Sequence, residues 1–220
     1  MHTPPGTQGA DLSQAFTLTD LLILVACAAL MAAALLPLIA RRSVHPSRLY
    51  CTNCMRQIGL AFRVWAADNG DHLPMQVSVT NGGTLELVAS GAVYPHFQVM
   101  SNELYTPKVL LCPEDKRRRY ATNFPLGLTD TNVSYFLNVD SLRADGASLL
   151  SGDRNITNRA RVGSHLVNLG RGATIAWNKA LHSEKGNLGF GDGGVNAFNN
   201  GGVPAGAWLR DGSTNRLAVP

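Results

Sequence analysis

Three of the four cysteines have a spacing that could support thiol chemistry. Cys51 and Cys54 form a Cys-x-x-Cys pair, and Cys112 precedes a proline. Such thiols can bind zinc, exchange electrons or join in a disulfide. A closed zinc site takes four ligands, however, and no well-spaced fourth Cys or His is obvious. A redox pair of this type ordinarily belongs to a thioredoxin-like fold, which the sequence does not indicate, so bridged, metal-bound and reduced thiols all stay open.

A glycine-rich stretch near the C-terminus holds a second group of polar side chains. Asn187, Asp192 and Asn196 could offer oxygen ligands to Ca²⁺, although no cofactor is expected. The simpler interpretation is an Asx-turn closed by the side chain of Asp192. His182 lies upstream, but no Ser or Cys nucleophile is tied to it by spacing. No enzymatic activity is therefore expected.

The overall composition is that of a folded protein. Of the 220 residues, 45% are hydrophobic and 15% are charged, which excludes a disordered, highly charged chain. The net charge is +4, and four consecutive basic residues occupy 116–119. A run of like charges in a loop is usually just solvated. We therefore predict no specific nucleic-acid partner.

The elements that must position these residues begin with a long apolar segment. The run Leu21–Ala40 carries no charged side chain, and every Lys and Arg follows residue 40. As a helix, its twenty residues would extend roughly 30 Å, the thickness of the hydrocarbon core of a bilayer. The sequence therefore predicts a membrane-spanning helix over 16–40, with Cys27 as a small apolar filler inside it.

A second helical pattern follows and leads into a strand-rich region. Apolar residues recur at three- and four-residue steps through 41–70, His45-Pro46 favours a kink or a break, and Gly70 marks the end of the helix. Beyond it, 71–220 reads as short strands separated by turns, with an extended loop from Asp140 to Leu169. The predicted strands are Met75–Val79, Val109–Leu111, Ser134–Val139, Thr174–Trp177, Leu188–Phe190 and Val195–Phe198.

These patterns predict an α+β fold. A long N-terminal helix, membrane-spanning in its first half, would pack with its amphipathic second half on a C-terminal head. The head would contain a small antiparallel sheet and long loops. An amphipathic helix cannot bury its apolar stripe alone, which is why the head must pack on it.

The residues Ala15-Phe16-Thr17-Leu18-Thr19-Asp20 and the apolar run after them resemble the cleavage and methylation motif of type IV prepilins and type II secretion pseudopilins. The resemblance implies that residues 1–15 are a leader, which a prepilin peptidase removes between Ala15 and Phe16. Phe16 would then become a methylated N-terminus, and Asp20 would be the acidic fifth residue used in assembly. The family usually has Gly and Glu where this chain has Ala15 and Asp20.

An ordered set of further motifs is similar to a prepilin-like subgroup of planctomycetes and verrucomicrobia. Proteins of that subgroup end in an element named for a His, nine residues and Asp-Gly, and here nine residues separate His182 from Asp192-Gly193. The resemblance rests on Cys51-x-Asn53, Gln57-Ile58-Gly59-Leu60-Ala61, Asp68-Asn69-Gly70, Leu111-Cys112-Pro113-Glu114-Asp115, Ser134-Tyr135 and the His182 to Gly193 element.

The resemblance implies a single-pass inner membrane protein with its head, 71–220, in the periplasm. The expected function is that of a structural subunit, either major or minor, of a type II secretion pseudopilus or a type IV pilus-like fibre. The expected partners are the prepilin peptidase, inner membrane lipid and other pilin-like subunits contacted through the N-terminal helix. The alternative is a membrane-anchored protein that binds an extracellular polymer without forming a fibre.

The implied compartment also bears on the thiols. The periplasm is oxidising, so a disulfide from the helix to Cys112 becomes the simplest expectation for these cysteines. Cys51 occupies the position of the subgroup's cysteine, whereas Cys54 stands where its members usually have Asn. The two lie about one helical turn apart, so either could be the partner of Cys112.

Overall fold

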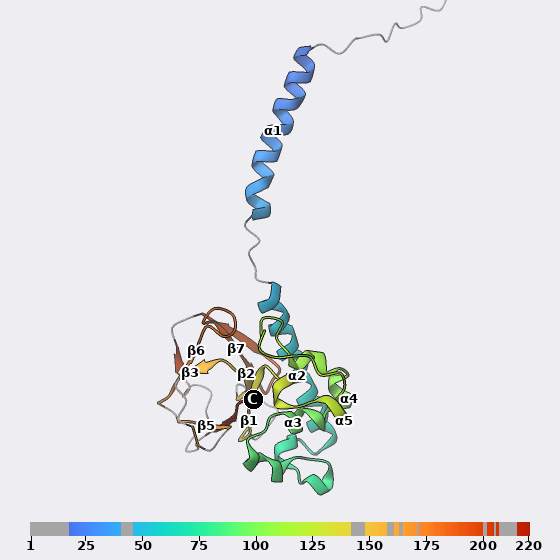
Figure 1. The fold of residues 1–220 in the computed structure, drawn as a ribbon, viewed down its shortest axis with the longest axis vertical. Helices are drawn as coiled ribbons and strands as arrows, with labels where there is room; N and C mark the ends of the chain where they lie inside the picture. The colour runs from blue at the N-terminus through green and yellow to red at the C-terminus, as the bar shows by residue number, and fades with distance from the viewer. Residues whose placement is uncertain are drawn as a thin grey trace, which may run out of the picture. The chain divides into compact units, whose positions relative to one another are not determined.

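The computed structural model describes residues 18–40, 46–141, 148–157, 161–162, 165–170, 172–199, 202–204, 206 and 215–220. The chain divides into two compact units, residues 1–44 and 45–220. The first unit contains helix α1, Leu18–Ala40, and the second contains the other described elements (Figure 1). The expected cleavage residues Ala15 and Phe16 lie outside the described residues.

Helix α1 is built from the apolar run of the sequence. Its side chains are described as far as Ala33, and all of those are exposed. Among the described residues, no helix is both long and apolar enough to cross a membrane.

Helix α2, Pro46–Asp68, begins at a proline. Proline is well tolerated at the start of a helix because the N–H that it lacks would have no partner there. The helix ends before Gly70, whose φ of 65° lets the N–H of Asp71 donate to the C=O of Ala66 at 2.8 Å. The predicted end of the helix at Gly70 is therefore confirmed.

One face of α2 packs against the head and is part of its hydrophobic core. Its buried side chains follow the three- and four-residue spacing seen in the sequence, although Leu49 is 55% exposed. The ring of Phe62 meets that of Phe97 edge-on, with centroids 6.0 Å apart. The buried members of this face are Cys51, Cys54, Met55, Ile58, Ala61, Phe62, Trp65 and Ala66. Because α2 completes the core, it belongs to the same compact unit as the head.

Short helical segments fill the chain between α2 and the first strand. They are η1 Pro74–Gln76, η2 Val79–Asn81, η3 Leu85–Ser90, α3 Tyr94–Gln98, α4 Ser101–Leu104, η4 Pro107–Leu110, α5 Phe124–Gly127 and η5 Asp130–Asn132.

The strands expected over Met75–Val79 and Val109–Leu111 were therefore wrong, since η1 and η2 occupy most of the first segment and η4 most of the second. Two of these helices begin with a proline, η1 with Pro74 and η4 with Pro107. The fixed φ of proline starts a tight turn rather than a strand. The Thr106 hydroxyl accepts from the backbone N–H of Lys108 and caps η4.

The described strands of the head form two antiparallel sheets. One has seven strands in the order β4-β5-β10-β1-β2-β7-β8, and the other has three in the order β3-β6-β9. The α+β fold with antiparallel sheets is thus confirmed. Their bounds are β1 Tyr135–Asn138, β2 Leu149–Asp153, β3 Ile156–Thr157, β4 Arg161–Val162, β5 Leu166–Leu169, β6 Thr174–Trp177, β7 Gly186–Phe190, β8 Val195–Phe198, β9 Val203–Pro204 and β10 Asn215–Ala218.

Four of the predicted strands are present, as β1, β6, β7 and β8. The extended loop expected from Asp140 to Leu169 was wrong, because β2 to β5 lie within it. Strand β2 is central and buried on both faces, so it lacks the alternation that identifies a half-exposed strand. A Cβ at Gly152 would lie 2.5 Å from the Phe136 ring, which shows how closely β1 and β2 approach.

The large sheet separates two apolar cores. On one face Tyr135 and Leu137 of β1 pack with α2 and the short helices. On the other face Phe136 packs with residues that include Trp177 of the small sheet. Figure 1 shows α2 to α5 on one side of β1 and β2, with β3 and β6 on the other. The head is therefore layered, with the large sheet in the middle.

The pH dependence of folding should carry a contribution from His96. This side chain is fully buried, its Nδ1 lies 2.7 Å from Oγ1 of Thr84, and burial lowers its pKa to about 4. The unfolded chain, with a pKa of about 6.5, therefore takes up a proton between about pH 6.5 and pH 4 that the folded chain does not. We expect His96 to lower the free energy of unfolding by up to about 3 kcal/mol through this window, measured by urea denaturation as a difference from a variant without the imidazole.

The control is His96→Gln, which removes the titrating group but keeps a polar side chain. Its free energy of unfolding should change less steeply between pH 6.5 and pH 4 than that of the parent, whatever its absolute stability. The same pH slope in both proteins would contradict the contribution of His96.

Candidate functional site

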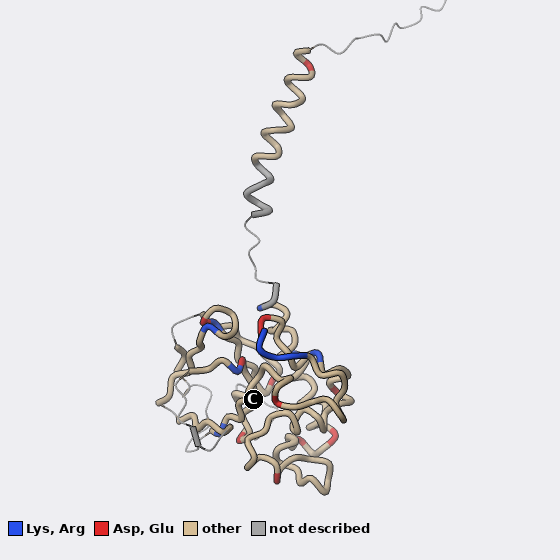
Figure 2. The backbone as a smooth tube through the Cα atoms, viewed as in Figure 1, with Lys and Arg blue, Asp and Glu red and all other residues tan. Residues whose placement is uncertain are grey.

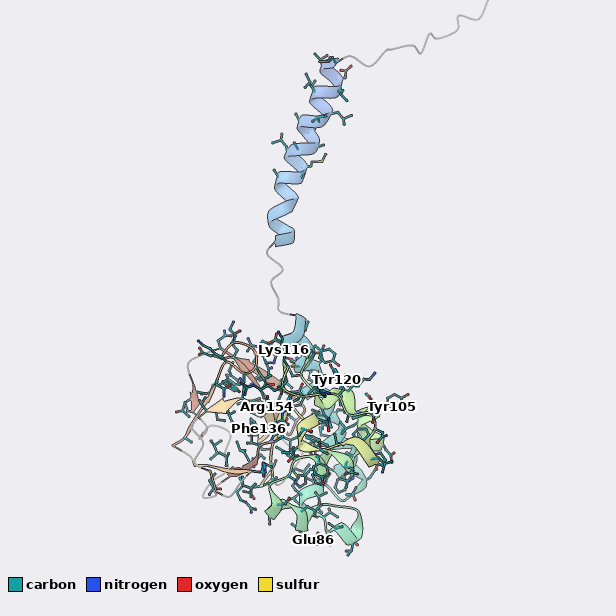
Figure 3. The ribbon with its side chains drawn as sticks, in the orientation of Figure 1. Glu86, Tyr105, Lys116, Tyr120, Phe136 and Arg154 are labelled. Atoms are coloured by element: carbon teal, nitrogen blue, oxygen red, sulfur yellow. The ribbon has the colours of Figure 1, made fainter. Side chains whose placement is uncertain are left out.

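Four segments that are distant in the sequence bring thiol, imidazole and carboxylate groups together inside the head. Helix α2 supplies Cys51, the loop after η4 supplies Cys112, the end of β2 supplies Asp153, and the turn before β7 supplies His182. None of the four is more than 6% exposed. We call this set the thiol–histidine cluster. It lies beside Arg154, which is labelled in Figure 3.

The distances within the cluster are short. The Cys51 thiol donates to Sγ of Cys112 over 2.7 Å, and Sγ of Cys112 lies 3.5 Å from Nε2 of His182. The same Nε2 is 3.8 Å from Oδ2 of Asp153, and the other ring nitrogen, Nδ1, is 3.1 Å from Oε2 of Glu114. The two sulfurs and the imidazole therefore face one another, and a carboxylate flanks each nitrogen of the ring.

The turn that presents His182 has an unusual backbone. His182, Ser183 and Glu184 have φ values of 51°, 53° and 67°, the left-handed region that side chains other than glycine rarely adopt. The backbone N–H of His182 donates to Oε2 of Glu114 at 3.1 Å, which fixes the turn to the Cys-Pro loop. Such conformations persist where the surroundings determine them, and they concentrate at functional sites.

Asp153 is a carboxylate without exposure to water. Its Oδ2 accepts from the backbone N–H and the side-chain amide of Asn187, at 2.7 and 2.9 Å. Its Oδ1 is buried and has no hydrogen-bond partner among the described residues. Burial raises the pKa of Asp153 to about 7, even though His182 and the Asn187 donors favour the charged form.

The two thiols are electrostatically unequal. The hydrogen bond from Cys51 lowers the pKa of Cys112 to about 6, assisted by His182 and opposed by burial. The same bond and burial raise the pKa of Cys51. Burial would lower the pKa of His182, but Cys112, Asp153 and Glu114 outweigh it and raise that pKa. Cys112 is thus the more acidic of the two thiols.

An ion pair positions the Cys-Pro loop over the end of β2. Asp115 is 3% exposed, and its two oxygens each accept at 2.6 Å from the guanidinium of Arg154. Ser134 adds a hydroxyl donor at 2.8 Å. Burial raises the pKa of Asp115, but the hydrogen bonds of Arg154 and Ser134 outweigh it and hold that pKa below its usual range. Because Arg154 follows Asp153 directly, this pair ties Cys112 and Asp153 to one another.

Replacing Asp115 by Asn should destabilise the head strongly, because it removes the carboxylate that accepts two charged hydrogen bonds from the largely buried guanidinium of Arg154. Loss of one partner of a buried pair typically costs about 3–5 kcal/mol. We expect a decrease in the free energy of unfolding of about 3 kcal/mol, measured by urea denaturation. The matched control is Asp192→Asn at an exposed carboxylate, which should change stability little. A similar small effect of both substitutions would contradict the role of the pair.

The order thiol, imidazole, carboxylate in Cys112, His182 and Glu114 is also the order of a nucleophile, its base and an orienting acid. Cys112 is fully buried, however, and Sγ of Cys51 lies 2.7 Å from its sulfur. No substrate carbonyl can approach the sulfur in this conformation. The geometry instead suits two reactions that need no substrate pocket, formation of a disulfide and binding of a metal ion.

The structure separates the two candidates for the partner of Cys112. Cys51 lies next to it, whereas Cys54 is hydrogen-bonded to the hydroxyl of Tyr50. All four cysteines are free thiols in the structure, and Cys27 on α1 is exposed. The expected disulfide stays a prediction, with Cys51 as the residue placed to form it.

The two parts of the expected His to Asp-Gly element lie in different environments. His182 is in the thiol–histidine cluster, but Asp192 and Gly193 form the turn between β7 and β8, where Asp192 is exposed. Oδ1 of Asp192 accepts from the N–H of Gly194 at 2.7 Å, which is the Asx-turn considered from the sequence. Gly193, at φ 84°, lies against α2, where a Cβ on Gly59 would be 3.1 Å from its Cα.

The oxygen ligands suggested for Ca²⁺ are not presented together. Asn187 is fully buried and hydrogen-bonded to Asp153, whereas Asp192 and Asn196 are exposed on the turn and on β8.

The described residues do contain another group of side chains that are close enough to bind one metal ion. Cys51, Cys112 and His182 each offer one donor atom, and these atoms lie within 4.8 Å of one another.

Two carboxylates of the site were missed from the sequence. Glu114 lies in the Leu111–Asp115 motif, which could have indicated that more than its cysteine matters. Asp153 carried no usable signal, because it lies in a segment that was interpreted as a loop. Its role becomes visible only when β2 is known to be a central strand.

The basic run behaves as the sequence predicts for a solvated loop. Figure 2 shows a continuous blue stretch on the tube, and Lys116, Arg117 and Arg119 are exposed. Arg118 is half-buried and donates to the backbone C=O of Asp130. One of the four basic residues therefore has a structural role.

No family model matches the chain, and neither the curated proteins nor the solved structures contain a match to it.

Oxidation should join Cys112 to Cys51 rather than to Cys54. Closing a loop of about 60 residues would stabilise the head by about 4 kcal/mol on the chain-entropy model. Non-reducing peptide mapping of the oxidised chain should find the peptide of Cys112 linked to the one that contains Cys51 and Cys54. The link should survive Cys54→Ser and disappear in Cys51→Ser. The reverse pattern, or four equally reactive thiols, would contradict this pairing.

Proposed function

We propose that the chain is a pilin-like subunit, anchored in the inner membrane by α1 and carrying its head in the periplasm. The observation that supports this most directly is the exposure of α1. Leu21, Leu22, Ile23, Leu24 and Val25 are each more than half exposed. The proposal also rests on the resemblance of the N-terminal motif to that of prepilins.

The five residues from Leu21 to Val25 are consecutive, so at about 100° per residue they point in every direction around the helix axis. A helix that is apolar all round is stable only where an apolar phase surrounds it. Lipid supplies such a phase, and so does a bundle of like helices. A pilin-like subunit would use the first before assembly and the second in the fibre.

The first turn of α1 contains the acid that the proposal requires. Asp20 lies there and is exposed. A carboxylate suits the N-terminal end of a helix because the backbone N–H groups of the first turn carry partial positive charge. After cleavage before Phe16, the new amino group would provide a full positive charge close by. In a fibre from which water is excluded, that pairing would offset the desolvation of the carboxylate.

A second candidate is an anchored protein whose head binds an extracellular polymer. The layered head is consistent with either role, because a rigid scaffold carries loops for binding as well as it carries a fibre surface. Processing of the leader separates the two. A fibre subunit must lose residues 1–15, whereas an anchored binder can keep them.

Processing gives the first test. We expect the membrane-extracted chain to begin at Phe16 and to carry an N-methyl group, because Ala15 is small and an apolar helix follows directly. Intact-mass and N-terminal mass spectrometry measure both features. Deleting the prepilin peptidase of the host should restore the longer chain. Residues 1–15 on most of the membrane-bound protein would refute the subunit role and leave the anchored binder.

The second test concerns Asp20 and follows from the charge pairing. If Asp20 only caps the helix, Asp20→Asn should assemble normally, since Asn caps about as well as Asp. If it pairs with the amine of Phe16, Asp20→Asn should fail in a crosslinking assay of fibre incorporation, whereas Asp20→Glu should incorporate at least as well as the parent. The stability of the head should stay within about 0.5 kcal/mol in both variants, because the substitution lies outside the head.

A further inference from the structure

We propose that the reduced chain binds one Zn²⁺ at the thiol–histidine cluster, with Cys51, Cys112 and His182 as ligands and Asp153 as the fourth. The proposal does not depend on the pilin-like function. It starts from the three donor atoms that lie within 4.8 Å of one another. Asp153 lies beside these donors, with its Oδ2 3.8 Å from Nε2 of His182.

The distances support a tetrahedral site. Bonds of about 2.3 Å to sulfur and about 2.0–2.1 Å to nitrogen place these two atoms about 3.5 Å apart in a tetrahedron, and Sγ of Cys112 lies 3.5 Å from Nε2 of His182. Two thiolates on one zinc lie about 3.8 Å apart by the same geometry. The sulfurs of Cys51 and Cys112, now 2.7 Å apart, must therefore separate by about 1 Å on binding.

His182 is oriented as a metal ligand. Its Nδ1 lies 3.1 Å from Oε2 of Glu114 but makes no hydrogen bond among the described residues. The negative charge of the nearby carboxylate favours the ring proton on Nδ1. The lone pair of Nε2 then points toward Cys112 and Asp153. Histidines that bind metals almost always direct their second nitrogen to a carboxylate, a carbonyl or a water, which sets the tautomer and the ring orientation. The left-handed turn at 182–184 holds the ring in this position.

Asp153 has an incomplete set of hydrogen bonds. Its Oδ1 lacks a hydrogen-bond partner among the described residues, and the carboxylate is fully buried. A disulfide between Cys51 and Cys112 is neutral and would supply no counter-charge to it. A zinc ion would supply two positive charges and a bond to the carboxylate. The disulfide accounts for two members of the cluster, and the metal accounts for all four.

The donor set selects the class of metal. Two thiolates, one imidazole and one carboxylate in a closed, buried site suit Zn²⁺ and do not suit the oxygen-binding ions Mg²⁺ and Ca²⁺. Binding displaces the protons that the thiols and the imidazole hold, so protons are released as the metal enters. Zinc and the disulfide use the same two sulfurs, so each state excludes the other.

The test uses the full chain in detergent, reduced and stripped with a chelator, and then titrated with Zn²⁺ against a chromophoric competitor. We expect one Zn²⁺ per chain. Co²⁺ in its place should give the visible bands of a tetrahedral site and a thiolate-to-metal band in the near-ultraviolet. The loaded chain should resist conversion to the Cys51–Cys112 disulfide by a mild oxidant, and oxidation should release metal one for one.

The variants locate the site. Cys112→Ser and His182→Gln should weaken Zn²⁺ binding at least 100-fold, Cys51→Ser should halve the thiolate-to-Co²⁺ band, and Asp153→Asn should alter the visible Co²⁺ bands. The matched control is Cys54→Ser, a buried thiol on the same helix, which should bind like the parent. Circular dichroism of each metal-free variant checks that it is folded.

The proposal is overturned if the reduced, folded chain binds no Zn²⁺, or if Co²⁺ gives no thiolate band in the unmodified chain. The second measurement needs no variant, so it stands even where a substitution prevents folding. Binding that is unchanged in both Cys112→Ser and His182→Gln, or that is lost in Cys54→Ser, would also overturn it.

Discussion

The ion pair between Asp115 and Arg154 is the constraint on which the interior of the head depends. It closes over the end of β2 with two hydrogen bonds of 2.6 Å, from groups that are almost entirely buried. Cys112 and Glu114 lie just before one partner, and Asp153 lies just before the other. Directional bonds of this kind fix the register of the loop against the strand. The spacing of the thiols, the histidine and the carboxylates follows from that register.

Hydrophobic periodicity and turn residues predicted the elements that have one buried face or that lie next to a turn. α2 has one buried face, so its apolar stripe and its glycine stop could be recognised in advance. Strands β6 and β8 were predicted at their observed bounds, and both lie near turn residues. β2 was missed because both of its faces are buried and it contains Gly152, whose missing side chain makes room for Phe136. Pairing with other strands, rather than any local preference, makes that segment a strand.

The candidate site was predictable only in part, for a related reason. Cys51, Cys112 and His182 were noticed in the sequence because of their residue types. Their spacing did not indicate that they meet, because they lie on a helix, a loop and a turn, and Cys51 and His182 are 131 positions apart. His182 and Asp192-Gly193 belong to one motif of the resemblance, and the structure places them in different surroundings. The histidine turns inward to the sulfurs, while the glycine turn lies against Gly59 of α2. His182 precedes β7 and Asp192-Gly193 follow it, so the length of this strand separates them in space although they are close in the sequence.

The position of β10 has a consequence for biogenesis. This strand, Asn215–Ala218, lies between β5 and β1 and is the only described strand that joins β4 and β5 to the rest of the large sheet. The sheet cannot close until residue 218 has emerged from the ribosome and, if the head is exported, from the translocation channel. Up to that point β1 presents an unpaired edge, and such edges can pair with other chains. In the nascent head, the edge of β1 therefore stays open to pairing with other chains until synthesis has passed Ala218.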